Sequence, residues 1–175
     1  MRRHLPAKFK SSLFTVPCRE AVYASSYPEA NEINRKILEK GISKQSWNIC
    51  PKIKEVDFFL RNNNSVHNIF FESHPEIAFY YLNMQNLKFG KKTEEGFKER
   101  ISILEKYLPS IEKIIAASLE KYKRKDVQRD DILDAVCMQI TAKLYFEKKV
   151  VPSDFNSDAE GLRMKIHYVD LAAAF

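Results

Sequence analysis

Apolar residues recur at intervals of three and four along most of the chain, which is the spacing of amphipathic helices. The clearest stripe contains Phe97, Ile101, Leu104 and Leu108 after a capping residue, Thr93. Proline and asparagine separate the periodic segments, because proline cannot continue a helix without losing a hydrogen bond. The predicted helices cover residues 28–40, 51–60, 75–82, 93–108, 111–122 and 130–144.

Two segments favour extended structure instead. Residues 68–72 (Asn-Ile-Phe-Phe-Glu) form the strongest strand prediction, and residues 162–169 alternate apolar and polar side chains. That alternation predicts an edge strand with one solvent-exposed face. A short extended piece is predicted at 13–16, and 42–51 is predicted to be a connector anchored by Trp47. Helices combined with strands indicate the α/β class.

The composition is that of one globular domain. The chain has 175 residues, of which 45% are hydrophobic, and only four glycines and seven prolines leave little room for linkers. No internal repeat of solenoid length occurs. We therefore expect a single domain over residues 1–175.

The chain is basic, with 29 Lys and Arg against 23 Asp and Glu and a net charge of +6. Such a charge attracts a polyanion, so nucleic acid is a possible partner. Solubility alone is the alternative explanation for the charge.

The cysteines Cys18, Cys50 and Cys137 are too scattered for a disulfide framework or a zinc site. The basic start lacks the apolar run of a signal peptide, and no segment has transmembrane length. These features predict a cytoplasmic protein without a membrane partner.

Asp131 and Asp134 are the first candidates for chemistry. A spacing of three places both side chains on one side of a helical turn, where they could converge on a hard cation such as Mg²⁺. Acids at a helix start are also what capping and the helix dipole favour. The pair alone does not distinguish a metal site from a helix cap.

Glu72 and His74 follow the predicted strand. Ligands bind beyond the carboxyl ends of strands in open α/β sheets, so Glu72 could complete a metal site with the two aspartates. His74 could transfer a proton. A solvated strand end and a hydrogen-bonded turn are the respective structural alternatives.

Lys91 and Lys92 precede Thr93 at a predicted helix start, where anions bind readily. They could contact phosphate, although a solvated loop explains them equally well. No Gly-rich phosphate loop, GxSxG elbow or HExxH occurs in the sequence, so P-loop hydrolysis and serine hydrolase chemistry have no support.

Taken together and in order, six segments resemble a known family, domain of unknown function family 429, which is described as predicted nucleases with a ribonuclease H-like fold. The segments are residues 13–21, 41–49, 52–57, 72–76, 91–100 and 130–135. The resemblance covers nearly the whole chain, and the ordered series is more specific than any one motif.

The resemblance implies a metal-dependent phosphodiester hydrolase similar to the Holliday-junction resolvase branch. Its D-x-x-D-A pattern is matched by Asp131, Asp134 and Ala135, and its glutamate at the end of the fourth strand by Glu72. These three carboxylates would be the catalytic groups and the ligands of Mg²⁺ or Mn²⁺ ions, which activate water and stabilise the leaving oxygen.

One departure from the family pattern concerns the start of the chain. The fold begins with three antiparallel strands, the first with an essential aspartate, whereas no acid occurs here before Glu20. We therefore expect an N-terminally truncated, helix-rich ribonuclease H-like fold with a reduced sheet and little activity by itself. Self-association, or another chain that supplies the missing segment, could complete it. The alternative function is a non-catalytic remnant that binds nucleic acid or protein.

Overall fold

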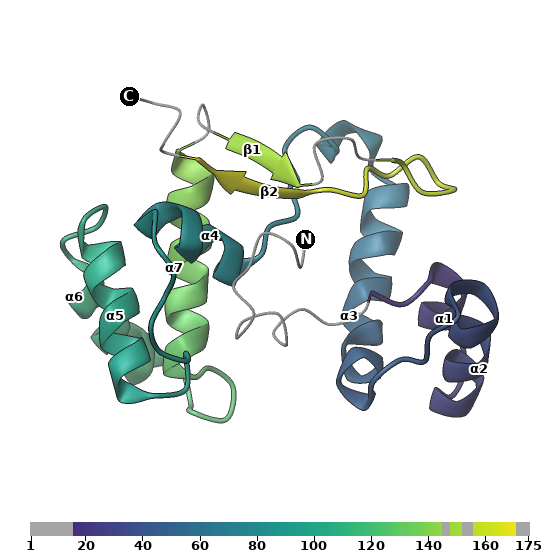
Figure 1. Ribbon diagram of the computed structural model, residues 1–175, viewed down its shortest axis with the longest axis horizontal. Coiled ribbons are helices and arrows are strands. Elements are labelled where there is room, and N and C mark those ends of the chain that lie inside the picture. Colours follow the sequence, from purple (N-terminus) through teal and green to yellow (C-terminus); the bar gives the residue numbers. More distant parts are fainter. Residues whose placement is uncertain (1–15, 145–147, 152–155, 171–175) are drawn as a thin grey trace. The chain divides into compact units, whose positions relative to one another are not determined.

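The computed structural model describes residues 16–144, 148–151 and 156–170, so most of the segment predicted at 13–16 lies outside the described residues. The chain is helix-rich (Figure 1). It divides into two compact units, of which unit 2 holds described residues up to Phe71 and unit 1 those from Glu72 onward. The single predicted domain over 1–175 stays a prediction.

Unit 2 contains helices α1, α2 and α3 and a short 3₁₀ helix, η3. Ser26 caps α2 through its side chain, which accepts a hydrogen bond from the Glu29 N–H. A small cluster of Ala21, Ala24, Ala30 and Ile42 forms the buried centre, and Trp47 packs against it. The bounds are α1 Arg19–Tyr23, α2 Tyr27–Leu38, α3 Lys44–Arg61 and η3 Asn64–Val66.

Helix α3 begins before Pro51, the residue at which the sequence predicts a helix start. Ser43 caps the helix through a bond from the Ser46 N–H at 3.0 Å, and the helix continues through Pro51 to Arg61. A proline inside a helix costs about 3 kcal/mol, so other interactions must outweigh it. Ser46 and Cys50, on the turns before the proline, are both buried. The predicted connector at 42–51 is therefore mostly helix.

Unit 1 is built around α7, which contacts α4, α5 and α6. Pro75 begins α4, Thr93 caps α5, and Pro109 separates α5 from α6, as the sequence predicts. The apolar face of α7 buries Leu133, Val136 and Cys137. The bounds are α4 Pro75–Asn83, α5 Glu94–Glu105, α6 Ile111–Lys121 and α7 Arg129–Lys143.

The described sheet has two antiparallel strands, β1 Lys148–Val151 and β2 Ile166–Val169, with Lys148 opposite Val169. All four residues of β2 are buried, so the solvent-exposed face predicted for the segment 162–169 is wrong. Helix α4 packs against this strand. The small sheet agrees with the expected reduction.

The strand predicted at 68–72 does not form. Its amides at Ile69 and Phe70 both bond to the Val66 carbonyl in a turn. Only its end meets the sheet, where the His167 N–H donates to the Glu72 carbonyl at 2.7 Å and Ser73 makes an isolated parallel bridge with His167. A strand requires a neighbouring backbone, and within the described residues this segment has one only at its last residues.

Candidate metal and phosphate site

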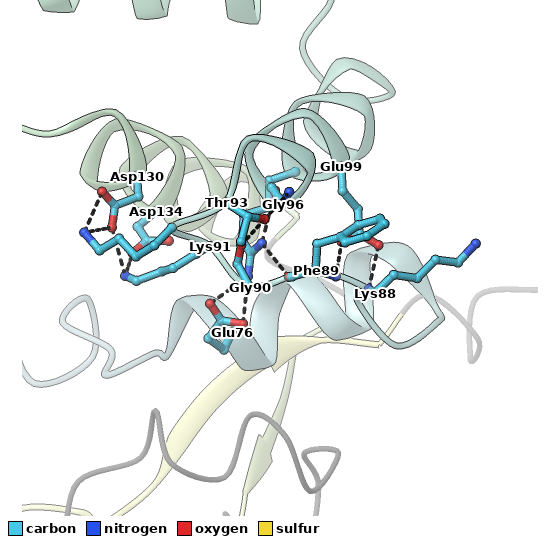
Figure 2. Close-up of polar contacts among 12 residues, drawn as sticks. Glu76, Lys88, Phe89, Gly90, Lys91, Thr93, Gly96, Glu99, Asp130 and Asp134 are labelled. Atoms are coloured by element: carbon cyan, nitrogen blue, oxygen red, sulfur yellow. Dashed lines mark hydrogen bonds and ion pairs between the residues drawn. The ribbon is translucent and has the colours of Figure 1, made fainter.

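Lys91, Lys92, Asp130 and Asp134 form a cluster in unit 1, which we call the lysine–aspartate cluster (Figure 2). Lys91 Nζ lies 3.0 Å from Asp134 Oδ2 and 3.5 Å from Asp130 Oδ2. Lys92 Nζ lies 2.8 Å from Asp130 Oδ2. Two lysines from the loop before α5 thus meet two acids one turn apart on α7.

The lysine loop is fixed by the start of α5. The Thr93 hydroxyl donates to the Gly90 carbonyl and accepts from the Gly96 N–H, both at 3.0 Å. A Cβ at Gly96 would collide with the Gly90 carbonyl, so the close approach requires glycine at position 96. This turn holds Lys91 and Lys92 in front of α7.

A buried ion pair between Arg100 and Glu76 also anchors the loop; Glu76 is labelled in Figure 2. Arg100 is fully buried, and its Nη2 donates to both Glu76 carboxylate oxygens at 2.9 and 3.0 Å. Its Nη1 donates to the carbonyls of Gly96 at 3.1 Å and Phe89 at 3.4 Å. Removal of one partner from such a pair costs about 3–5 kcal/mol, because the other charge stays buried. Arg100 therefore connects α4 to the backbone on both sides of the lysine loop.

The two acids of the cluster differ in electrostatics. Burial raises the pKa of Asp134, although Lys91 acts in the opposite direction, and one of its oxygens, Oδ1, is buried with no hydrogen-bond partner among the described residues. Burial also opposes ionisation of Asp130, but the hydrogen bond from Lys92 and the charges of both lysines lower its pKa overall. Lys91 is partly desolvated, yet its bond to Asp134 and the charge of that acid raise its pKa. Asp134 is the acid with unmet bonding capacity.

Asp131 does not join this cluster. Its carboxylate accepts a hydrogen bond from the Gln128 N–H at 2.9 Å, and Gln128 reciprocates in a capping box at the start of α7. The side chain that lies beside Asp134 is Asp130, four residues earlier. Asp131 thus caps α7, which is the alternative to a metal ligand that the sequence left open.

Glu72 and His74 lie near the sheet. The Glu72 carbonyl accepts a hydrogen bond from the His167 N–H, and partial desolvation raises the pKa of the Glu72 carboxyl although the residue is exposed. His74 is the residue before α4 and makes no side-chain capping bond to that helix. Among the described residues, no group of three or more His, Cys, Asp or Glu side chains is arranged to hold a metal ion. Glu72, Asp131 and Asp134 are therefore not gathered into one site.

Comparison with known proteins gives a family. Residues 1–156 match the family described as Protein of unknown function (DUF429). The chain belongs to this family. No curated protein and no solved structure gives a match. In the described part of this DUF429 chain, no helix is both long and apolar enough to cross a membrane.

The DUF429 chain also contains site residues that sequence reasoning missed, namely Glu76, Arg100 and Asp130. Arg100 lies three residues after Phe97 and four before Leu104, inside the predicted apolar stripe. A charged residue on a buried face is a sign of a buried ion pair. Asp130 and Asp134 are four apart, a spacing that equally places two side chains side by side on a helix.

Proposed function

We propose that this DUF429 chain is a nuclease-family domain with a ribonuclease H-like ancestry, in which Mg²⁺ or Mn²⁺ binds at Asp134 and supports phosphodiester hydrolysis. One observation supports this most directly: Asp134 Oδ1 is buried and bonds to nothing in the described residues, while Oδ2 faces an ammonium group. An acid in such surroundings can gain by binding a further cation.

The residues suit an ion that needs few protein ligands, such as Mg²⁺, better than an ion that needs a closed cage of protein ligands. Mg²⁺ keeps several waters and is commonly bound by one or two carboxylates, so a group of three is not required. Asp134 would be the main ligand, with Glu72 and Asp131 as the further ligands that the family resemblance implies. Asp131 would have to leave its cap, which costs about 1 kcal/mol.

The chain's own groups have distinct proposed roles. The metal, when bound, would lower the pKa of a water and stabilise negative charge on phosphate. Lys91 and Lys92 now contact Asp130 and Asp134, and a cation bound to these acids would release the ammonium groups to contact phosphate. His74 would be the proton-transfer group. Because the Asp131 carboxylate is engaged in capping, we expect activity of the chain alone to be weak or absent.

Metal binding is the direct test. We expect calorimetric titration to show Mn²⁺ or Mg²⁺ binding to the wild-type chain, tighter binding to Lys91→Met, which removes the competing ammonium, and none to Asp134→Asn. Lys113→Met, an exposed lysine on α6, is the matched control and should behave like wild type. No binding to either wild type or Lys91→Met would remove the metal site. Cleavage of labelled DNA and RNA in Mn²⁺, lost in Asp134→Asn, would establish hydrolysis.

A second candidate is a non-catalytic domain that binds nucleic acid or a protein partner. It is favoured by the engaged carboxylates, since Asp131 caps α7 and Asp130 binds Lys92. Salt-dependent nucleic-acid binding that survives the double change Asp131→Asn with Asp134→Asn, without any metal-dependent cleavage by wild type, would support this candidate over the first.

A further inference from the structure

Unit 2 has an aromatic surface that the proposed metal site does not use. At the end of α3 and in the segment after it, four apolar side chains are exposed: Phe58 at 68%, Phe59 at 39%, Ile69 at 70% and Phe70 at 53%. We call these four residues the phenylalanine surface. Two of them, Phe59 and Phe70, are in contact, and contiguous exposed apolar groups often mark a binding site in soluble proteins.

The phenylalanine surface is held in place by its backbone. The side-chain amides of Asn62 and Asn63 donate through Nδ2 to the backbone carbonyls of Phe58 and Phe59, respectively, both at 2.7 Å, and close the end of α3. The His67 ring nitrogen Nε2 lies 2.8 Å from the Leu60 carbonyl. The rings of Phe59 and Phe70 contact each other, with centroids 5.3 Å apart. The rings are therefore presented on a hydrogen-bonded framework.

The charge around these rings favours an anionic partner. No Asp or Glu occurs from Phe58 to Phe71, and Arg61 lies three residues after Phe58, on the same side of α3. Arg61 also lines an open cavity of about 260 Å³ together with Arg19, Glu20 and Tyr23. The cavity thus brings two guanidinium groups and one carboxylate, that of Glu20, together in unit 2.

A buried carboxylate orients both guanidinium groups. Arg19 donates to Asp57 Oδ1 through Nε at 3.2 Å and Nη2 at 2.7 Å, and Arg61 Nη1 lies 3.8 Å from Asp57 Oδ2. A guanidinium has five N–H donors, so contact with Asp57 and contact with a phosphate are compatible. Arginine forks match the geometry of phosphate oxygens.

We propose that unit 2 binds single-stranded nucleic acid, with bases stacked on Phe58 and Phe70 and backbone phosphates held by Arg61 and Arg19. Exposed aromatic rings next to basic groups are the usual means of binding single strands, because every base has a face that stacks. The inference deepens the proposed function and rests on it, since it names the substrate class that the nuclease domain would take. It requires no metal.

Fluorescence anisotropy with the full chain tests this in EDTA at low salt. The probe is a fluorescein-labelled oligo(dT) or oligo(U) of about 12 nucleotides, within the range that single-strand sites cover. We expect binding that weakens with salt, and a loss of affinity of about 5-fold or more for Phe58→Leu and for Phe70→Leu. Leucine keeps an apolar side chain but cannot stack, whereas Phe58→Trp should retain affinity. Arg61→Gln should lower the salt slope by about one.

Phe89→Leu is the matched control, because Phe89 is an exposed phenylalanine of unit 1, and it should bind like wild type. The oligonucleotide assay is carried out in EDTA and the metal titration without oligonucleotide, so failure of the metal site and failure of this inference are distinguishable. Absence of binding by the wild-type chain, or equal binding by both leucine variants, would overturn the inference. So would sedimentation showing self-association that Phe58→Ala abolishes, without oligonucleotide binding, which would assign the surface to a second copy of the chain.

Discussion

Asp57 in unit 2 and Asp134 in unit 1 are both carboxylates that face basic side chains from other elements, but they are bonded differently. Asp57 Oδ1 accepts two bonds from Arg19, and Oδ2 accepts one from the Tyr23 hydroxyl at 2.8 Å. Asp134 accepts one bond from Lys91, and its Oδ1 has no hydrogen-bond partner in the described residues. Both carboxylate oxygens of Asp57 therefore accept hydrogen bonds, whereas only one oxygen of Asp134 does.

The difference appears in their pKa values. Burial opposes the charge of both groups, but the bonds from Arg19 and Tyr23 lower the pKa of Asp57 overall, whereas the single bond from Lys91 leaves that of Asp134 raised. Neighbouring charges add to this difference, because Arg19 and Arg61 lower the pKa of Asp57, whereas the carboxylates of Glu76 and Asp130 raise that of Asp134. A fully hydrogen-bonded carboxylate stabilises the fold, whereas a carboxylate with an unbonded oxygen can still bind a ligand.

Asp57→Asn should have the largest effect on stability. It leaves Arg19 and Tyr23 without their charged acceptor, so we expect a loss of about 2–3 kcal/mol in the free energy of unfolding. Urea unfolding followed by Trp47 fluorescence measures it, because Trp47 is the sole tryptophan and lies in the same unit. Glu55→Gln, an exposed acid on α3, is the control and should change stability by less than about 0.5 kcal/mol.

The Asp57 effect should depend on pH. A lowered folded-state pKa gives stability that is present above the unfolded pKa of about 3.9 and is lost as pH falls through the folded value. The gap between wild type and Asp57→Asn should therefore be full at pH 6 and shrink below about pH 4. A gap that is constant across this range would show that the charge of Asp57 does not stabilise unit 2.

Tyr23→Phe should have a smaller effect in the same unit. The change removes one donor to Asp57 and leaves both bonds from Arg19, so we expect a loss of about 1 kcal/mol. The same Trp47 fluorescence assay applies, with Tyr122→Phe as an exposed control. An effect as large as that of Asp57→Asn would mean that Tyr23, rather than Arg19, is the main support of the acid.

Asp131→Ala should cost about 0.5–1 kcal/mol, because the side chain accepts the Gln128 N–H in the capping box of α7. Urea unfolding followed by far-UV circular dichroism measures it, with Asp126→Ala as the control from the loop before α7. No loss of stability would show that the cap is weak and that the carboxylate is available as the metal ligand implied by the family resemblance.

Asp134→Asn should have the smallest effect on the free energy of unfolding, and the change should be in the opposite direction to that of Asp57→Asn. A raised folded-state pKa means that ionised Asp134 opposes folding; this penalty is absent below the unfolded pKa of about 3.9 and complete above the folded value. In EDTA at pH 7 the variant should be within about 0.5 kcal/mol of wild type or slightly more stable, and the gain should vanish near pH 3.5. A loss comparable to that of Asp57→Asn would show that Asp134 is as well bonded as Asp57.

Local signals in the sequence determined much of unit 1. Pro75, Thr93 and Pro109 act within one helical turn, so the places where α4, α5 and α6 begin follow from neighbouring residues alone. The ordered motifs also gave the DUF429 family, which the comparison confirms over residues 1–156. The helix-rich character was predicted from the spacing of apolar residues, and the reduced sheet from the departure from the family pattern.

Only the tertiary structure decided the rest. Pro51 is retained inside α3, where the packing of the helix outweighs the cost of the proline. The apolar run 68–72 stays largely outside the sheet, because a strand depends on backbone partners that its own residues cannot supply. In the site, the sequence paired Asp134 with Asp131, whereas the structure places Asp130 beside it because Lys91 and Lys92 approach from the α5 loop. Helical spacing restricts which side chains share a face, but the position of a loop from another element selects the pair that meets.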